Sequence, residues 1–174
     1  MQEKRYWTKE EGMKLAEALL RRSDCQTYLQ QLHDRILRNV VIQEGEEPTE
    51  DPKVLLKEYI EKREALTALV QDIRRTNEKT VVQNVTLSNG KKLKKDITLG
   101  ELLAIRDELL DKREMLEEVA REASGKDERY SLSEIKKVAM VDVKALRKKI
   151  DEYSKEYRLL DLKIQELNWL VEII

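Results

Sequence analysis

The pattern of apolar positions predicts four long helices, and it is most regular in the last of them. After Asp142, a residue suited to cap a helix start, apolar or aromatic residues recur at alternating intervals of three and four up to Ile174. They are Val143, Leu146, Ile150, Tyr153, Tyr157, Leu160, Ile164, Leu167, Val171 and Ile174. Because this seven-residue repeat is typical of left-handed coiled coils, we expect this helix to lie along a partner for most of its length.

Three earlier segments show the same repeat with interruptions. Their repeat positions, here called seams, are Leu15, Ala18, Arg22, Cys25, Leu29, Leu32, Ile36 and Asn39; Leu56, Tyr59, Arg63, Leu66, Val70, Ile73 and Asn77; and Leu102, Ile105, Leu109, Lys112, Leu116, Val119 and Ala123. Each seam has one basic residue near its middle: Arg22, Arg63 or Lys112. Such a side chain either reaches past the edge of the seam or belongs to a buried polar layer that fixes helix register.

Local signals place the ends of these helices. Asp51-Pro52 combines a capping side chain with proline at the first helical position, and Thr98 to Glu101 has the spacing of a capping box. Ser124-Gly125 is a helix stop. Alternating residues around Asn89-Gly90 predict a β-hairpin at about 80–97.

These elements predict an all-α protein with four long antiparallel, coiled-coil-like helices and a small β-hairpin between the second and third. The helices form either one bundle or paired helical hairpins. We expect residues 1–12 to be an N-terminal extension and residues 13–174 to form a single helical domain, since 174 residues fit one domain.

Composition narrows the class of protein. Charged residues make up 40% of the chain, phenylalanine is absent and the net charge is −1, so no overall field favours nucleic acid or an anionic membrane. The single cysteine, Cys25, excludes an internal disulfide and fits a reducing compartment. No apolar stretch is long enough to span a membrane. We therefore expect a soluble, cytoplasmic protein without a membrane partner.

Catalytic and metal-binding patterns are weak. The acidic stretch between Asn39 and Pro52 lacks the spacing of a calcium loop, and a single histidine, His33, cannot build a di-iron site. Two acidic pairs, Glu58 with Glu61 and Glu108 with Asp111, are similar to the motifs of Mg-dependent nucleotide pyrophosphohydrolases. That activity is the weakest alternative, and we expect no cofactor and no catalytic or metal-binding residues.

Three surface clusters are candidates for binding. A charged cap is expected where the acidic loop meets the connection before the last helix, and its members are Glu44, Glu46, Glu47, Arg129 and Lys136. A basic tip near the hairpin would contact nucleic acid through phosphates, and its members are Arg74, Arg75, Lys91, Lys92, Lys94 and Lys95. An oligomer interface is expected at the apolar C-terminus, through Trp169, Leu170, Ile173 and Ile174.

Five motifs resemble the septicolysin-type family of small bacterial helical proteins. They are MKLAEALLRRSD (13–24), QEGEEPTEDP (43–52), IRRTN (73–77), RYSLSEIK (129–136) and QELNW (165–169). The resemblance implies a helical fold and an unestablished function, and it transfers no catalytic residue. Residues 1–12 precede the usual start of that family, and the hairpin is longer and more basic than the family's.

Together these features favour an oligomeric scaffold or protein-interaction module without catalysis, with a homo-oligomer as the expected assembly. A nucleic-acid-contacting protein that uses the basic tip is the main alternative.

Overall fold

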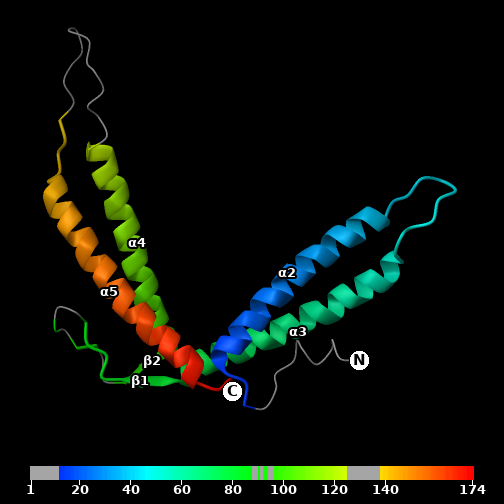
Figure 1. Cartoon of the computed structure of the whole chain (residues 1–174), viewed down its shortest axis with the longest axis horizontal. Coiled ribbons are helices and arrows are strands. Elements are labelled where there is room, and N and C mark those ends of the chain that lie inside the picture. The colour runs from blue at the N-terminus through cyan, green and yellow to red at the C-terminus, as the bar shows by residue number, and fades with distance from the viewer. Residues whose placement is uncertain (1–11, 88–89, 91, 94–95, 125–137) are drawn as a thin grey trace, which may run out of the picture. The chain divides into compact units, whose positions relative to one another are not determined.

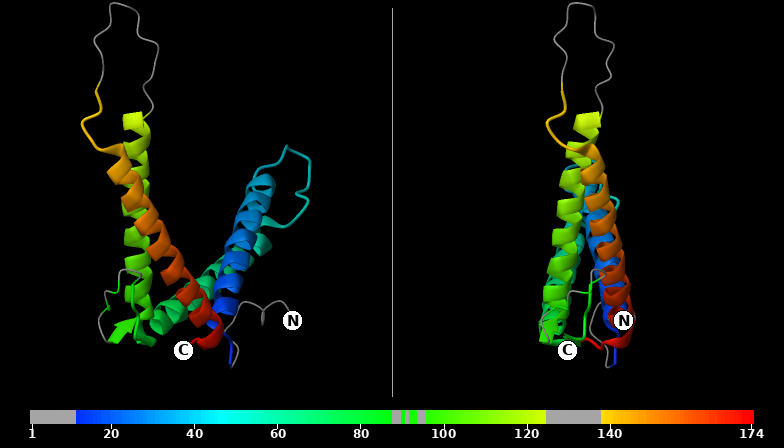
Figure 2. Two further views of the ribbon diagram at one scale, coloured as in Figure 1. Left: turned by 60° about the vertical axis from the view of Figure 1, so that its left-hand side comes forward. Right: turned by 90° about the vertical axis from the view of Figure 1, so that its left-hand side faces the viewer.

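The computed structural model describes residues 12–87, 90, 92–93, 96–124 and 138–174. Its elements are the helices α2 (Leu15–Asn39) and α3 (Pro52–Lys79), the strands β1 (Val81–Gln83) and β2 (Asp96–Thr98), and the helices α4 (Leu99–Ser124) and α5 (Val143–Leu170). Helix α2 pairs with α3, and α4 pairs with α5 (Figures 1 and 2). The predicted all-α class, with four long helices and a small hairpin between the second and third, is confirmed.

The chain divides into two compact units. Unit 1 comprises Met1–Thr80 together with Leu167–Ile174, and unit 2 comprises Val81–Glu166. Each unit holds one helical hairpin, α2 with α3 in unit 1 and most of α5 with α4 in unit 2. None of the described helices is long and apolar enough to cross a membrane.

The predicted helix starts are confirmed by their caps. The Asp51 carboxylate accepts a 2.8 Å hydrogen bond from the backbone of the first turn of α3, where Pro52 is the first residue. Thr98 and Glu101 exchange two hydrogen bonds of 2.8 and 3.1 Å at the start of α4. Asp142 accepts two, of 2.9 and 3.1 Å, from the first turn of α5. Each cap satisfies backbone N–H groups that have no partner inside the helix.

Unit 1 is held together by the predicted seam of α2. Its seam residues are buried except Arg22, which is half-buried; the buried ones are Leu15, Ala18, Cys25, Leu29, Leu32, Ile36 and Asn39. Against α3 they form two apolar clusters, one of Cys25 and Leu29 with Leu66, the other of Leu32 and Ile36 with Leu55. Burial of these side chains is the main stabilising contribution of the hairpin.

On α3 the predicted seam is wrong by one residue along half of its length. The buried residues of α3 are Leu55, Lys62, Leu66, Leu69, Ile73 and Thr76, whereas the predicted Leu56 and Arg63 are exposed. Apolar residues occupy both 55 and 56, and both 69 and 70, so the apolar pattern alone cannot choose between adjacent positions. The buried basic residue is therefore Lys62, whose amine lies 5.7 Å from the ring centre of Tyr28, a cation–π contact.

The C-terminal segment closes unit 1 by pairing with the start of α2. The backbone N–H of Leu15 donates to the carbonyl of Val171, and that of Ile173 donates to the carbonyl of Met13, both over 2.9 Å. These bonds form an antiparallel bridge that also includes an ion pair between Lys14 and Glu172 at 2.9 Å. The chain's last eight residues thus belong to the same unit as its first described ones.

Unit 2 begins with the predicted β-hairpin. Strands β1 and β2 are antiparallel, and Val82 pairs with Ile97, both of them buried. Gly90 has a positive φ of 81°, which suits the turn, and its N–H donates to the carbonyl of Leu87 over 2.9 Å. Asn89, the other residue of the predicted turn, lies outside the described residues. Helix α4 follows β2 directly, so the hairpin sits at the base of α4 (Figure 1).

Helices α4 and α5 bury fewer side chains than α2 and α3. The side chain of Arg106 on α4 donates to Asp161 on α5 over 3.2 Å, and the guanidinium of Arg113 lies 6.0 Å from the ring centre of Tyr157. Most seam residues of α4 remain half-buried, and the predicted seam lysine, Lys112, is exposed. Unit 2 therefore retains apolar surface that its own described residues do not cover.

Candidate interaction surfaces

The loop between α2 and α3, residues 40–50 and here called the α2–α3 tip, is anchored at its base. The side-chain Nδ2 of Asn39 donates a hydrogen bond to the carbonyl of Arg35 over 2.9 Å, and its Oδ1 accepts one from the backbone N–H of Glu50 over 3.1 Å. Two nitrogens of the Arg35 guanidinium also donate to the Glu50 carboxylate, Nε over 3.0 Å. These hydrogen bonds lower the pKa of Glu50. Both ends of the loop are thereby fixed to α2.

Beyond this anchor the tip exposes aliphatic and acidic side chains next to each other. Val40, Val41 and Ile42 are all exposed, and Val41 reaches 80%. A turn follows, closed by a 3.1 Å hydrogen bond from Glu46 N–H to the Gln43 carbonyl. Gly45 permits this turn because its φ is +92°. The acidic members of the predicted charged cap, Glu44, Glu46 and Glu47, are exposed on the same loop.

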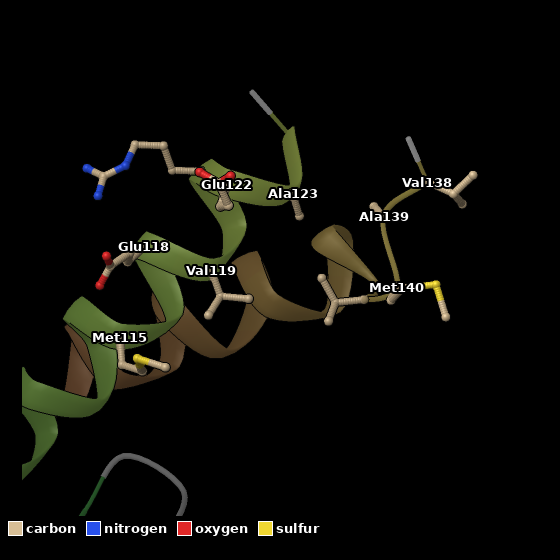
Figure 3. A pocket seen from close by; sticks show the side chains of 10 residues that line it. Met115, Glu118, Val119, Glu122, Ala123, Val138, Ala139 and Met140 are labelled. Atoms are coloured by element: carbon tan, nitrogen blue, oxygen red, sulfur yellow. The ribbon is translucent and has the colours of Figure 1, made fainter. Parts of the chain in front are cut away.

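A second exposed aliphatic run precedes α5. Residues 138–149, here called the α4–α5 tip, begin with Val138, Met140 and Val141, all exposed; Met140 reaches 91%. Beside this run lies an open cavity of about 690 Å³, whose α4 wall includes Met115, Val119 and Ala123. Figure 3 shows that Val119 and Glu118 leave α4 in opposite directions, with the valine on the α5 side. The cavity therefore has an apolar wall and a charged rim.

Basic residues follow this aliphatic run on the first turns of α5. Lys144, Arg147, Lys148 and Lys149 are all exposed. The other predicted members of the charged cap, Arg129 and Lys136, lie outside the described residues. The contact between the two halves of that cap therefore stays a prediction.

The predicted C-terminal interface has an exposed and a buried part. Trp169 is 65% exposed and Leu170 is 62% exposed, whereas Ile173 is 7% exposed and belongs to the core of unit 1. Ile174 is partly exposed, and its N–H donates to the buried hydroxyl of Thr76 over 2.9 Å. Of the predicted interface, Trp169 and Leu170 are thus the most exposed members, and Ile173 is not exposed.

The predicted basic tip is only partly described. Arg74 and Arg75 are exposed on α3 in unit 1, and Arg75 pairs with Asp72 at 3.2 Å. Lys92 is exposed in the hairpin of unit 2, where it forms an isolated bridge with Thr86. The remaining members, Lys91, Lys94 and Lys95, lie outside the described residues. Nucleic-acid binding by this cluster stays a prediction.

Several residues considered as candidates for catalysis or metal binding make contacts with neighbouring side chains or backbone groups. Burial raises the pKa of the Cys25 thiol, and its Sγ lies 3.8 Å from the carbonyl oxygen of Lys62. Of the acidic pairs, Glu58 accepts a hydrogen bond from the Tyr28 hydroxyl and Glu108 pairs with Lys112. Among the described residues, no three His, Cys, Asp or Glu side chains gather in a way that could hold a metal ion.

Comparison with known proteins identifies the family. A model of a family of unknown function, DUF6847, matches residues 22–173. The chain belongs to this family. A crystal structure of a functionally unknown conserved protein from Corynebacterium diphtheriae is also similar. It shares 40% sequence identity at a TM-score of 0.80, and the match covers 93% of this chain and 99% of that chain. A comparison with curated proteins found no match to this member of the DUF6847 family.

The family match corrects the resemblance drawn from short motifs. Assignment to the septicolysin-type family is wrong, because the matching family is DUF6847 and the similar structure carries no such identity. RYSLSEIK (129–136) lies outside the described residues, and the other motifs have local structural roles. QEGEEPTEDP covers residues 43–50 of the α2–α3 tip and the N-cap of α3, and QELNW lies in the last turns of α5. Since capping and turn residues follow general rules of helix geometry, they recur in unrelated helical proteins.

Proposed function

We propose that this protein is a homo-oligomeric scaffold or protein-interaction module that acts through binding rather than catalysis. The observation that carries the proposal is an exposed tryptophan and leucine on a fixed backbone. Trp169 and Leu170 are mostly exposed at the end of α5, and the residues that follow are tied to the start of α2. Tryptophan is enriched among the residues that contribute most of the binding energy at protein interfaces.

The rigidity of this segment supports the proposal. The carbonyl of Val171 accepts a hydrogen bond from Leu15, and the N–H groups of Ile173 and Ile174 donate to Met13 and Thr76. A partner that covers Trp169 therefore orders little additional backbone, and ordering is one of the main costs of association. Fully burying a large aromatic or aliphatic side chain contributes about 1.5–3 kcal/mol. Covering two such side chains in each copy would make a weak but specific contribution to assembly.

Size-exclusion chromatography with light scattering tests the proposal on the full chain at low and high salt. We expect a discrete oligomer that persists at high salt, because screening weakens ion pairs but not apolar contacts. Replacing Trp169→Ser and Leu170→Ser should reduce the oligomer mass at a given concentration. The matched control is Ile60→Ser, which changes an exposed aliphatic side chain on α3. A monomer at all concentrations would refute the proposal, and equal behaviour of both variants would remove the C-terminus from the interface.

A further inference from the structure

We infer that the α2–α3 tip of one copy docks onto the α4–α5 tip of a second copy. The inference rests on the proposed self-association and adds a second surface to it. Each tip exposes a short aliphatic run, residues 40–42 in one and Val138, Met140 and Val141 in the other. Contiguous exposed aliphatic residues are unfavourable in water and typically mark a surface that another protein covers.

The charges beside the two aliphatic runs are opposite. The α2–α3 tip carries Glu44, Glu46 and Glu47, all exposed. The α4–α5 tip carries four exposed basic residues: Lys144, Arg147, Lys148 and Lys149. Within the part of the chain that the structure describes, none of these seven side chains forms an ion pair. Apolar and electrostatic complementarity thus coincide at both tips.

The same charges specify which tips pair. Two α2–α3 tips would bring acidic side chains together, and two α4–α5 tips would bring basic ones together, so like pairs are disfavoured. Only an unlike pair joins opposite charges, and a second copy of the chain supplies the complementary tip in equal amount. The charged parts of both tips are also pre-organised, one by the Arg35–Glu50 anchor and the other by the Asp142 cap of α5, so docking orders little of their backbone.

Cross-linking between cysteines measures the contact directly. One full-length variant carries Val41→Cys and another carries Met140→Cys; the native Cys25 is buried and serves as background. The two are mixed at low ionic strength and treated with a short bismaleimide. We expect a covalent two-chain product that is roughly tenfold more abundant than in either variant alone. The control replaces Met140→Cys with Leu162→Cys, another exposed apolar position of unit 2 outside the tips.

Exchange of the charges tests specificity. In the Val41→Cys chain, Glu44→Lys, Glu46→Lys and Glu47→Lys should reduce the cross-linked product roughly tenfold because basic side chains then meet basic ones. Adding Lys144→Glu, Arg147→Glu and Lys148→Glu to the Met140→Cys chain should restore it. All six positions are exposed, so neither set disturbs a core. Restoration by the second set of reversals cannot arise from loss of folding.

Three other outcomes overturn the inference. A product no more abundant than the Leu162→Cys control, from a protein that light scattering shows to be oligomeric, refutes tip docking and leaves the proposed function standing. A monomeric protein without any product refutes both. If a single chain carrying both cysteines cross-links internally while the mixture does not, the two tips meet within one chain and the second copy is excluded.

Discussion

Replacing Thr76→Val is expected to loosen the C-terminal segment of unit 1. The Thr76 side chain is completely buried in α3, and its hydroxyl makes two hydrogen bonds. It donates to the carbonyl of Asp72 over 2.8 Å and accepts the N–H of Ile174 over 2.9 Å. Valine has nearly the same shape but can form neither bond. The substitution therefore isolates the contribution of the hydroxyl.

The free-energy cost of the substitution depends on the groups that lose their hydrogen bond to the Thr76 hydroxyl. A typical hydrogen bond contributes about 1 kcal/mol net, and a buried group left without a partner costs about 1–3 kcal/mol. The N–H of Ile174 loses its partner at a partly buried position, whereas the Asp72 carbonyl remains within the helix ladder. We expect a loss of about 2 kcal/mol in the free energy that keeps the C-terminal segment closed.

Hydrogen exchange followed by mass spectrometry measures this opening in the peptide that contains residues 167–174. A change of about 2 kcal/mol corresponds to exchange that is roughly thirtyfold faster. Thr67→Val is the matched control, because the Thr67 hydroxyl also donates to a carbonyl four residues earlier, over 3.0 Å, but is exposed and has no long-range partner. If both variants exchange at the wild-type rate in this peptide, the tether between Thr76 and Ile174 does not hold the terminus.

Three further predictions concern the core and the anchor of unit 1. Leu66→Ala should lower the free energy of unfolding by about 2–4 kcal/mol in urea titrations, because Leu66 is buried between α2 and α3; Ile60→Ala, on the exposed face, should change it by less than about 0.5 kcal/mol. Arg35 lowers the pKa of Glu50, so the pair's contribution is complete above the ordinary glutamate pKa of about 4.3 and is lost as the pH falls through the lowered value. The difference in melting temperature between wild type and Glu50→Gln should therefore be constant from pH 7 to about 5 and vanish in stronger acid; a pH-independent difference would argue against the pairing. Because burial raises the pKa of the Cys25 thiol, a thiol reagent should label it far more slowly in buffer than in urea, and equal rates would contradict its burial.

Much of the fold could be predicted because it follows from local rules. The start of α3 was predictable from Asp51-Pro52, and the seam of α2 from its own repeat, since both depend on residues close together in the chain. The face of α3 was not predictable to the residue. Its sequence offers apolar side chains at adjacent positions, and contact with Leu32 and Ile36 of α2 selects Leu55 over Leu56.

The candidate surfaces were harder to predict, because exposure is a property of the folded chain. The C-terminal residues Trp169 and Ile173 are both apolar, yet the bridge to the start of α2 buries only the isoleucine. From the sequence alone, the aliphatic runs at residues 40–42 and 138–141 could equally be helix ends that pack against the rest of the chain. Only the structure shows that each run remains uncovered by the described residues of its own unit.

The bridge between the start of α2 and residues 171–174 also determines the order in which the chain can fold. During synthesis, residues 12–80 leave the ribosome before all of unit 2, but the segment that completes their unit is made only after unit 2. Unit 2 is continuous in sequence and can fold as it emerges. Unit 1 must keep the edge beside Lys14 unpaired throughout that time, so the first helical hairpin to be made is the last to be finished.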